Sequence, residues 1–240
     1  MDWKLRPAGD FGLSPRERLA SLRRELGFLG TATHWCWRQF VRLYLRCFHG
    51  LRVMGREHLP EPPFVMIANH ASHLDTLTLA SVLPLALIDR VHPIAAEDTF
   101  FTSFATSAFA AFAVNALPLR RRATKRADLA TLRARLLEEE LVFILFPEGT
   151  RSRDGSMASF KPGIGALVAG SEVPVVPCYL EGAFAALPPH RRWPRPTRLK
   201  LRIGPPLAFG DLANDRGGWA GVAARCETAV RALALDDRRI

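Results

Sequence analysis

Cysteine is scarce in this sequence, and the few that occur have no metal-binding spacing. Four cysteines are scattered over 240 residues, at Cys36, Cys47, Cys178 and Cys226. Zinc fingers need paired cysteines two to four residues apart, and the four cysteines form no such pair. We therefore exclude the zinc-finger class and expect free thiols in a reducing compartment.

Targeting signals and repeats are also missing. The stretch from Met1 to Pro7 has neither an apolar core nor a small-residue cleavage site, so we expect no secretory signal peptide. We find no internal repeat, low-complexity linker or RNA-binding signature, which argues against a nucleic-acid partner. The net charge of +10 therefore indicates another anionic partner: membrane lipid, a phosphorylated substrate or an acidic carrier protein.

One segment, residues 99–119, lacks charged side chains and is long enough to span a membrane. Its many Ala, Ser and Thr residues, together with Asn115 and Pro118, make its hydrophobicity weak. We expect it to pack in or on the domain, with a membrane-spanning role as the alternative.

The longer apolar runs predict the fold class. Residues 64–68 and 141–146 are apolar on both faces, as in buried parallel strands, and residues 128–140 have helical periodicity. This order predicts a single α/β domain over residues 51–240, with a largely parallel mixed sheet flanked by helices. Further strands are expected at 51–55, 91–96, 173–180 and 199–203, the last at an edge or half-exposed. Further helices are expected from Ser72 to near Pro84 or shortly after, from Pro162, and over 219–235.

Residues 1–50 predict a polar tail followed by amphipathic helices. Leucines at helical spacing end at Gly30, where we expect the first helix to stop, and a second helix covers 33–48. On it, Arg38, Arg42 and Arg46 form one stripe and aromatic residues form another, which favours an anionic membrane interface. The alternative is a helix packed on the domain with its arginines in water.

A heptapeptide at a strand-to-helix turn carries the first candidate site. His70 and Asp75 cannot meet on one regular helix, because five residues rotate by roughly 500°. They can meet if His70 lies in the turn and Asp75 in the first helical turn. Ser72 supports this geometry, because Ser-x-x-Asp is a capping signature with Ser72 at the N-cap. Asp75 then either orients His70 as a general base or merely completes the cap.

Two motifs together carry a family resemblance. Asn69-His70-Ala71-Ser72-His73-Leu74-Asp75 resembles the first motif of the glycerophospholipid acyltransferases, whose best-known members acylate lysophosphatidic acid. Phe146-Pro147-Glu148-Gly149-Thr150-Arg151-Ser152 resembles their third motif, and the similarity extends from about Val53 to Leu207.

The resemblance implies transfer of a fatty acyl group from acyl-CoA or acyl-carrier protein to the hydroxyl of a lysophospholipid. The default acceptor is 1-acylglycerol 3-phosphate. It also implies a peripheral or monotopic protein on the cytoplasmic face of an anionic membrane, with no metal and no other cofactor. Because no nucleophilic Ser or Cys fits the motif, we expect direct transfer without an acyl-enzyme.

The resemblance also suggests roles for single residues. His70 is the general base and Asp75 orients it. Arg151, with Arg120 or Arg121 of a poorly matching second motif, holds the acceptor phosphate bidentately. The other expected substrate contacts are Glu148, Gly149, Thr150 and Lys161. Glu148 either bonds acceptor hydroxyls, holds Arg151 in place or forms a purely structural ion pair.

Three alternatives remain open from the sequence. A metal-dependent hydrolase would use His70, His73 and Asp75 as ligands, although no further cluster supplies a clear third or fourth ligand. A non-catalytic lipid-binding protein would explain the charge but not the paired motifs. Within the acyltransferases, the acceptor can be another lysolipid, for example a lyso-ornithine lipid.

Overall fold

A computed structural model describes residues 11–14, 17–18, 21, 28–96, 107–119 and 126–235 of the chain. Within these residues seven strands form one sheet. They are β1 (Arg52–Met54), β2 (Phe64–Ala68), β3 (Val91–Ala96), β4 (Leu117–Leu119), β5 (Val142–Leu145), β6 (Val175–Glu181) and β7 (Lys200–Ile203).

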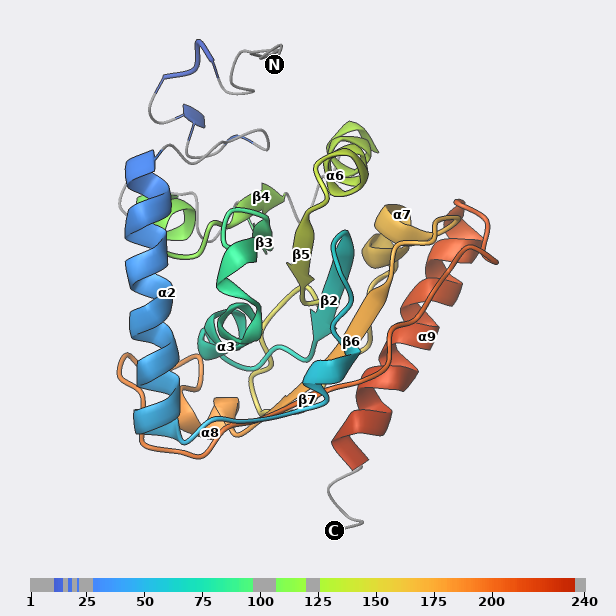
Figure 1. Cartoon of the computed structure of the whole chain (residues 1–240). Helices are drawn as coiled ribbons and strands as arrows, with labels where there is room; N and C mark the ends of the chain where they lie inside the picture. The colour runs from blue at the N-terminus through green and yellow to red at the C-terminus, as the bar shows by residue number, and fades with distance from the viewer. Residues whose placement is uncertain are drawn as a thin grey trace.

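The strand order is β1-β7-β6-β2-β5-β3-β4, with β2 at the centre (Figure 1). Each neighbouring pair is parallel except β6 and β7, which are antiparallel. All five residues of β2 are buried, because the strand is covered on both faces. This sheet confirms the predicted largely parallel α/β fold.

Helices cover both faces of the sheet. On one side α3 lies between α2 and the strands, and on the other side lie α7 and α9 (Figure 1). The helices are α2 (Phe28–His49), α3 (Leu74–Val82), α6 (Arg126–Glu138), α7 (Gly165–Val168), α8 (Ala183–Ala186) and α9 (Arg216–Leu235). Shorter turns are the 3-10 helices η1 (Arg56–His58), η2 (Leu85–Leu87) and η4 (Pro162–Ile164), and the π-helix η3 (Phe109–Ala113).

Alternate side chains of the central strands enter two separate hydrophobic clusters. Phe64 and Met66 pack with α2 and α3 in one cluster, whereas Val65 and Ile67 pack with α6, α7 and α9 in the other. Successive side chains of a strand point to opposite faces, so an unbroken apolar run fills both layers. The double-sided core therefore explains why the predicted strands read as continuous apolar runs.

The structure corrects two expectations about secondary structure. Gly30 does not end a helix, since it lies inside α2, which runs from Phe28 to His49. Strand β7 is neither an edge strand nor half-exposed, because it lies between β1 and β6. Arg202 made its sequence look half-exposed, but this side chain is buried, pairing with Glu181 at 2.8 Å and lying over the Tyr179 ring.

The arginines of α2 correct a third expectation. Arg38 is buried and Arg42 is half-buried, so neither projects into water or towards lipid. Both donate hydrogen bonds to backbone carbonyls of the segment around the end of α3. The stripe that looked basic in sequence therefore faces the domain, except for the exposed Arg46.

Only part of the uncharged segment at 99–119 is described. Its last residues form η3 and β4, and β4 pairs with β3 in the sheet. In the described ranges, none of the helices has the length and apolarity that crossing a membrane requires. The four cysteines are all free thiols, two exposed on α2 and two buried.

The contact between α7 and α9 provides a test of the fold. A Cβ at Gly165 would lie 2.3 Å from the Cα of Trp219, whereas one at Gly163 would meet nothing within 4 Å. We expect Gly165→Ala to lower the free energy of unfolding by about 1–3 kcal/mol, because α9 has to move. Urea denaturation measures this, with Gly163→Ala as the matched control at unchanged or slightly higher stability. Equal effects of the two substitutions would contradict the helix packing.

Candidate functional site

The pairing of β2 with β5 brings the two sequence motifs together. Ile67 is the register partner of Leu145, and both strands end shortly afterwards. Three residues further along each chain, the His70 backbone N–H donates to Glu148 Oε1 at 2.7 Å. The Ser152 N–H also donates to the His70 carbonyl at 2.8 Å. The site therefore lies beyond the carboxyl ends of parallel strands, where open α/β sheets bind ligands.

An imidazole and a buried carboxylate form the centre of the site. His70 Nδ1 lies 2.9 Å from Asp75 Oδ2, and the Asp75 side chain is 1% exposed. The same oxygen accepts the backbone N–H groups of Ala71 and Ser72, at 2.7 and 2.8 Å. These three donors stabilise a negative charge away from water. The predicted contact between His70 and Asp75 is thus confirmed.

The helix start differs by one residue from the prediction. The structure places His73, not Ser72, at the N-cap, because α3 begins at Leu74. Ser72 Oγ still accepts the Leu74 N–H at 3.1 Å, and it donates to the Leu187 carbonyl at 2.8 Å. Asp75 accepts the Ser72 N–H, the bond that a capping box would make if Ser72 were the N-cap. Asp75 therefore completes the cap and holds His70 at the same time.

Phe146 orients the imidazole, a role that the sequence did not predict. Its ring lies parallel to that of His70, with centroids 4.0 Å apart and an interplanar angle of 15°. With Nδ1 turned towards Asp75, the stacked ring has one remaining nitrogen, Nε2, for a substrate. The signal in the sequence is an aromatic residue directly after the apolar run of β5, next to Pro147.

Glu148 holds the backbone of the turn that contains His70. Its Oε1 accepts the His70 N–H and its Oε2 accepts the Ala158 N–H at 2.9 Å. Burial raises the pKa of this carboxyl above its ordinary value, although the two N–H donors act in the opposite direction. In the described residues Glu148 has no ion pair, and the backbone-holding role was not among the predicted ones.

Arg151 lies close enough to His73 to affect its charge. Desolvation, and then the positive charge of Arg151, lowers the pKa of His73 to about 4, although His73 retains an exposed edge. At neutral pH His73 is therefore uncharged, and Arg151 supplies positive charge near it, next to Ser152, whose N–H binds the His70 carbonyl. Predicted contacts Arg120 and Arg121 lie outside the described residues.

The remaining predicted residues lie in or beside the glycine turn that precedes Arg151. Gly149 has a φ of +74°, and a Cβ there would lie 2.7 Å from Lys161 Nζ. The ammonium group therefore lies over the glycine turn, where a side chain would displace it. Thr150 and Lys161 are both exposed.

A largely apolar cavity of about 410 Å³ opens beside the imidazole. Its wall includes His70, His73 and Thr76, together with apolar residues of β3, η3, β4 and β5. The volume is within the roughly 300–1,000 Å³ of small-molecule sites. Among the described residues, no group of three or more His, Cys, Asp or Glu side chains is arranged to hold a metal ion.

Fold and site together define an α/β protein with an imidazole–carboxylate pair in the wall of an apolar cavity. The acyltransferase family model matches residues 50–181, more than half of the chain. The chain belongs to the acyltransferase family, which confirms the resemblance.

Two relatives and one solved structure show how far the similarity extends. The chain is 30% identical over 182 residues to 1-acyl-sn-glycerol-3-phosphate acyltransferase alpha of Mus musculus, covering 74% of this chain and 62% of that protein. It is 33% identical over 141 residues to the beta protein of Homo sapiens, covering 58% and 49%. The chain thus spans less than two thirds of these relatives.

The crystal structure of the 1-acyl-sn-glycerophosphate acyltransferase from Thermotoga maritima has the same fold. The TM-score is 0.65 at 24% identity, and the match covers 88% of this chain and 80% of the other.

The two backbone hydrogen bonds that Glu148 accepts provide a test of the site. In Glu148→Gln the amide NH₂ faces a backbone N–H, so one of the two buried donors loses its acceptor. We expect a loss of about 1–3 kcal/mol in the free energy of unfolding, measured in urea. The matched control is Glu227→Gln, because the partly exposed Glu227 also accepts a backbone N–H, from Phe160. A smaller effect for Glu148→Gln than for Glu227→Gln would contradict this role.

Proposed function

We propose that this protein is an O-acyltransferase that moves a fatty acyl group from a thioester to the free hydroxyl of 1-acylglycerol 3-phosphate. The observation that carries the proposal is the His70 ring, held by Asp75 and Phe146 in the wall of an apolar cavity. The names of the relatives from Mus musculus and Homo sapiens support the same reaction and acceptor.

In the proposed reaction, His70 takes the proton of the acceptor hydroxyl. Nδ1–H donates to Asp75, so the Nε2 lone pair accepts the proton while the hydroxyl oxygen attacks the thioester carbonyl. The tetrahedral intermediate then expels the thiolate, which recovers the proton from Nε2, and the products are an ester and a free thiol. Asp75 stabilises the transient imidazolium.

The two parts of the acceptor match two parts of the site. The guanidinium of Arg151 suits a phosphate, which it can bind through two parallel hydrogen bonds. The apolar cavity suits an acyl chain. The donor is proposed to be acyl-CoA or acyl-carrier protein, since the reacting thioester is the same in both. The reaction requires neither a metal nor another cofactor.

The other candidate functions have less support. Asp75 Oδ2 already accepts three hydrogen bonds, and no metal-holding cluster is present among the described residues. No observation therefore supports the metal-dependent hydrolase. A purely lipid-binding protein would have no use for a buried carboxylate aligned on an imidazole. A lyso-ornithine acceptor remains an alternative that the acceptor assay decides.

The general base provides the test of the reaction. We expect His70→Ala to lower kcat by roughly 10²–10⁴-fold, because His73, the other imidazole of the cavity wall, has a pKa of about 4 and is a much weaker base. Transfer of a radiolabelled acyl group from acyl-CoA to 1-acylglycerol 3-phosphate measures it.

Circular dichroism and vesicle flotation serve as controls for this variant, and both should match the wild-type protein. Near wild-type transfer by His70→Ala would refute the mechanism. Parallel assays of the wild-type protein with monoacylglycerol and a lyso-ornithine lipid test the acceptor, and preference for either over 1-acylglycerol 3-phosphate would refute the assignment.

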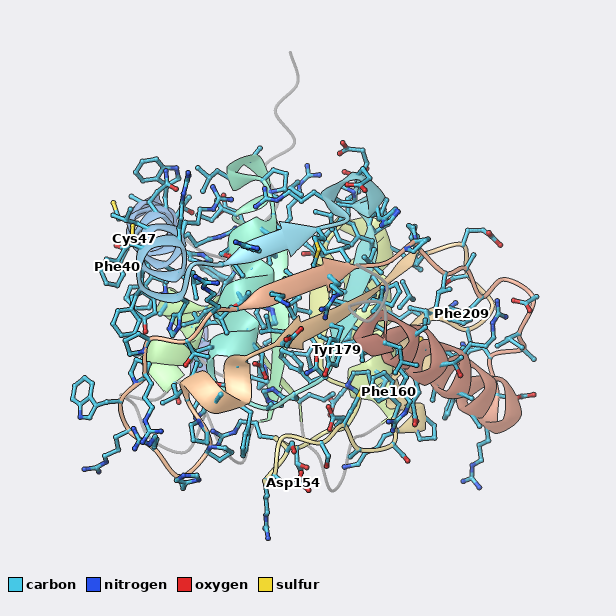
Figure 2. The ribbon with its side chains drawn as sticks, turned by 90° about the horizontal axis from the view of Figure 1, so that it is seen from below. Phe40, Cys47, Asp154, Phe160, Tyr179 and Phe209 are labelled. Carbon is cyan, nitrogen blue, oxygen red and sulfur yellow. The ribbon has the colours of Figure 1, made fainter. Side chains whose placement is uncertain are left out.

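We further propose that the protein binds anionic membranes peripherally, on the cytoplasmic side. Support comes from the outer face of α2, where Phe40 is 58% and Leu43 is 62% exposed. Figure 2 shows Phe40 and Cys47 on the side of α2 that faces away from the sheet. Free thiols on this face agree with a reducing compartment.

A second exposed element has the composition of a membrane contact. Trp193 is 80% exposed, and its neighbours Arg191, Arg192 and Arg195 are exposed as well. Aromatic rings and arginines both favour the interface of an anionic bilayer. The loop adjoins the end of α2, because His49 Nδ1 bonds the Thr197 carbonyl at 3.0 Å.

The apolar face of α2 provides the test of membrane binding. We expect Phe40→Gln with Leu43→Gln to weaken binding to phosphatidylglycerol-containing vesicles by at least about 10-fold, because two apolar side chains no longer enter the interface. Co-sedimentation measures the affinity. Leu137→Gln is the control, since Leu137 is also exposed but lies on α6. Equal binding by the wild-type protein and the double variant would contradict the proposal.

A further inference from the structure

Two arginines of α2 bind the carboxyl-terminal end of α3. Arg38 Nη2 donates to the carbonyls of Ala80 and Leu83. Arg42 Nε donates to the Ser81 carbonyl at 2.8 Å, and its Nη2 donates to that of Leu83. The last four carbonyls of a helix have no partner within the helix, so these guanidinium groups supply partners from a neighbouring element.

Burial of these two guanidinium groups costs free energy, because charged groups lose their hydration. Desolvation, and then the charge of Arg42, lowers the pKa of Arg38 to about 10. Desolvation and the nearby Arg56 lower the pKa of Arg42 as well. Within the described ranges neither guanidinium pairs with a carboxylate. The cost of burying these two charges is offset by the negative end of the α3 dipole and by the hydrogen bonds to the carbonyls.

The opposite end of α3 carries the catalytic geometry. Asp75 lies in its first turn, and Thr76 and Leu77 form part of the cavity wall. The helix is only nine residues long and lies between α2 and the sheet (Figure 1). A shift of α3 along its axis would therefore change the 2.9 Å contact between Asp75 Oδ2 and His70 Nδ1.

We propose that Arg38 and Arg42 are positioning residues for acyl transfer, which hold α3 so that Asp75 stays against His70. The inference rests on the proposed function. It makes the catalytic geometry depend on how α2 is seated on the domain. The same helix that presents Phe40 and Leu43 outward thus holds the dyad from its inner side.

The test uses Arg42→Met, because Arg42 is less buried than Arg38 and its loss is better tolerated. With acyl-CoA and 1-acylglycerol 3-phosphate in mixed micelles, we expect kcat to fall roughly 10-fold or more, since small misplacements of catalytic groups are costly. The acceptor KM should change by less than about 2-fold, because Arg151, which is proposed to bind the acceptor phosphate, does not lie on α3. Arg42→Lys keeps the charge and should recover part of kcat.

The matched control is Arg133→Met. Arg133 of α6 also donates to carbonyls at the end of a helix, those of Leu167 and Ala169 beside α7, but α7 carries no part of the dyad. We expect this variant to lose stability without losing kcat. Equal losses of kcat in both variants would overturn the proposal, and so would unchanged kcat in Arg42→Met.

Hydrogen–deuterium exchange separates this inference from the proposed function. The amides of Ala71 and Ser72 donate to Asp75, so they should exchange at least about 10-fold faster in Arg42→Met, but not in Arg133→Met. If the wild-type protein fails to transfer acyl groups, the proposed function is wrong and exchange alone decides the positioning role. Unchanged exchange at both amides would overturn it.

Discussion

The hydrogen bond from the His70 N–H to the Glu148 carboxylate connects the two halves of the site. It lies beyond the paired ends of β2 and β5, and it joins residues far apart in sequence. The oxygen that accepts it belongs to a carboxylate whose second oxygen holds Ala158. Because both oxygens bind backbone, the turn that carries His70 and the turn that carries Arg151 cannot move independently without leaving a buried donor unpaired.

Periodicity and motif spacing were sufficient to predict the parts of this structure that obey local rules. The apolar runs of β2 and β5, the end of α3 before Pro84 and the meeting of His70 with Asp75 all follow from residues close in sequence. The placement of the site at one edge of the sheet also follows in outline, because parallel strands of an α/β sheet place their carboxyl ends together. The stacking of Phe146 on His70 could not be predicted from the sequence, because it depends on how the chain leaves the ends of β2 and β5.

The errors arose where tertiary contacts override local chemistry. A glycine weakens a helix by only about 1 kcal/mol, so packing of α2 on the domain carries the helix through Gly30. Alternating charges predict a half-exposed strand, but Glu181 and Tyr179 on the neighbouring β6 give Arg202 partners and allow it to be buried. Arginines at helical spacing predict a solvated or lipid-facing stripe, and only the position of α3 shows that its carbonyls are the partners of Arg38 and Arg42.

The position of these arginines changes how the positive charge of the chain is interpreted. A net charge of +10 suggests attraction to anionic lipid, yet two of the most membrane-like arginines face inward. Long-range attraction is unaffected by this, because it depends on the summed charge. Insertion, in contrast, depends on apolar area, which α2 presents through Phe40 and Leu43. In the two proposals, the apolar outer face of α2 would contact the membrane, whereas its inner face binds the carbonyls at the end of α3.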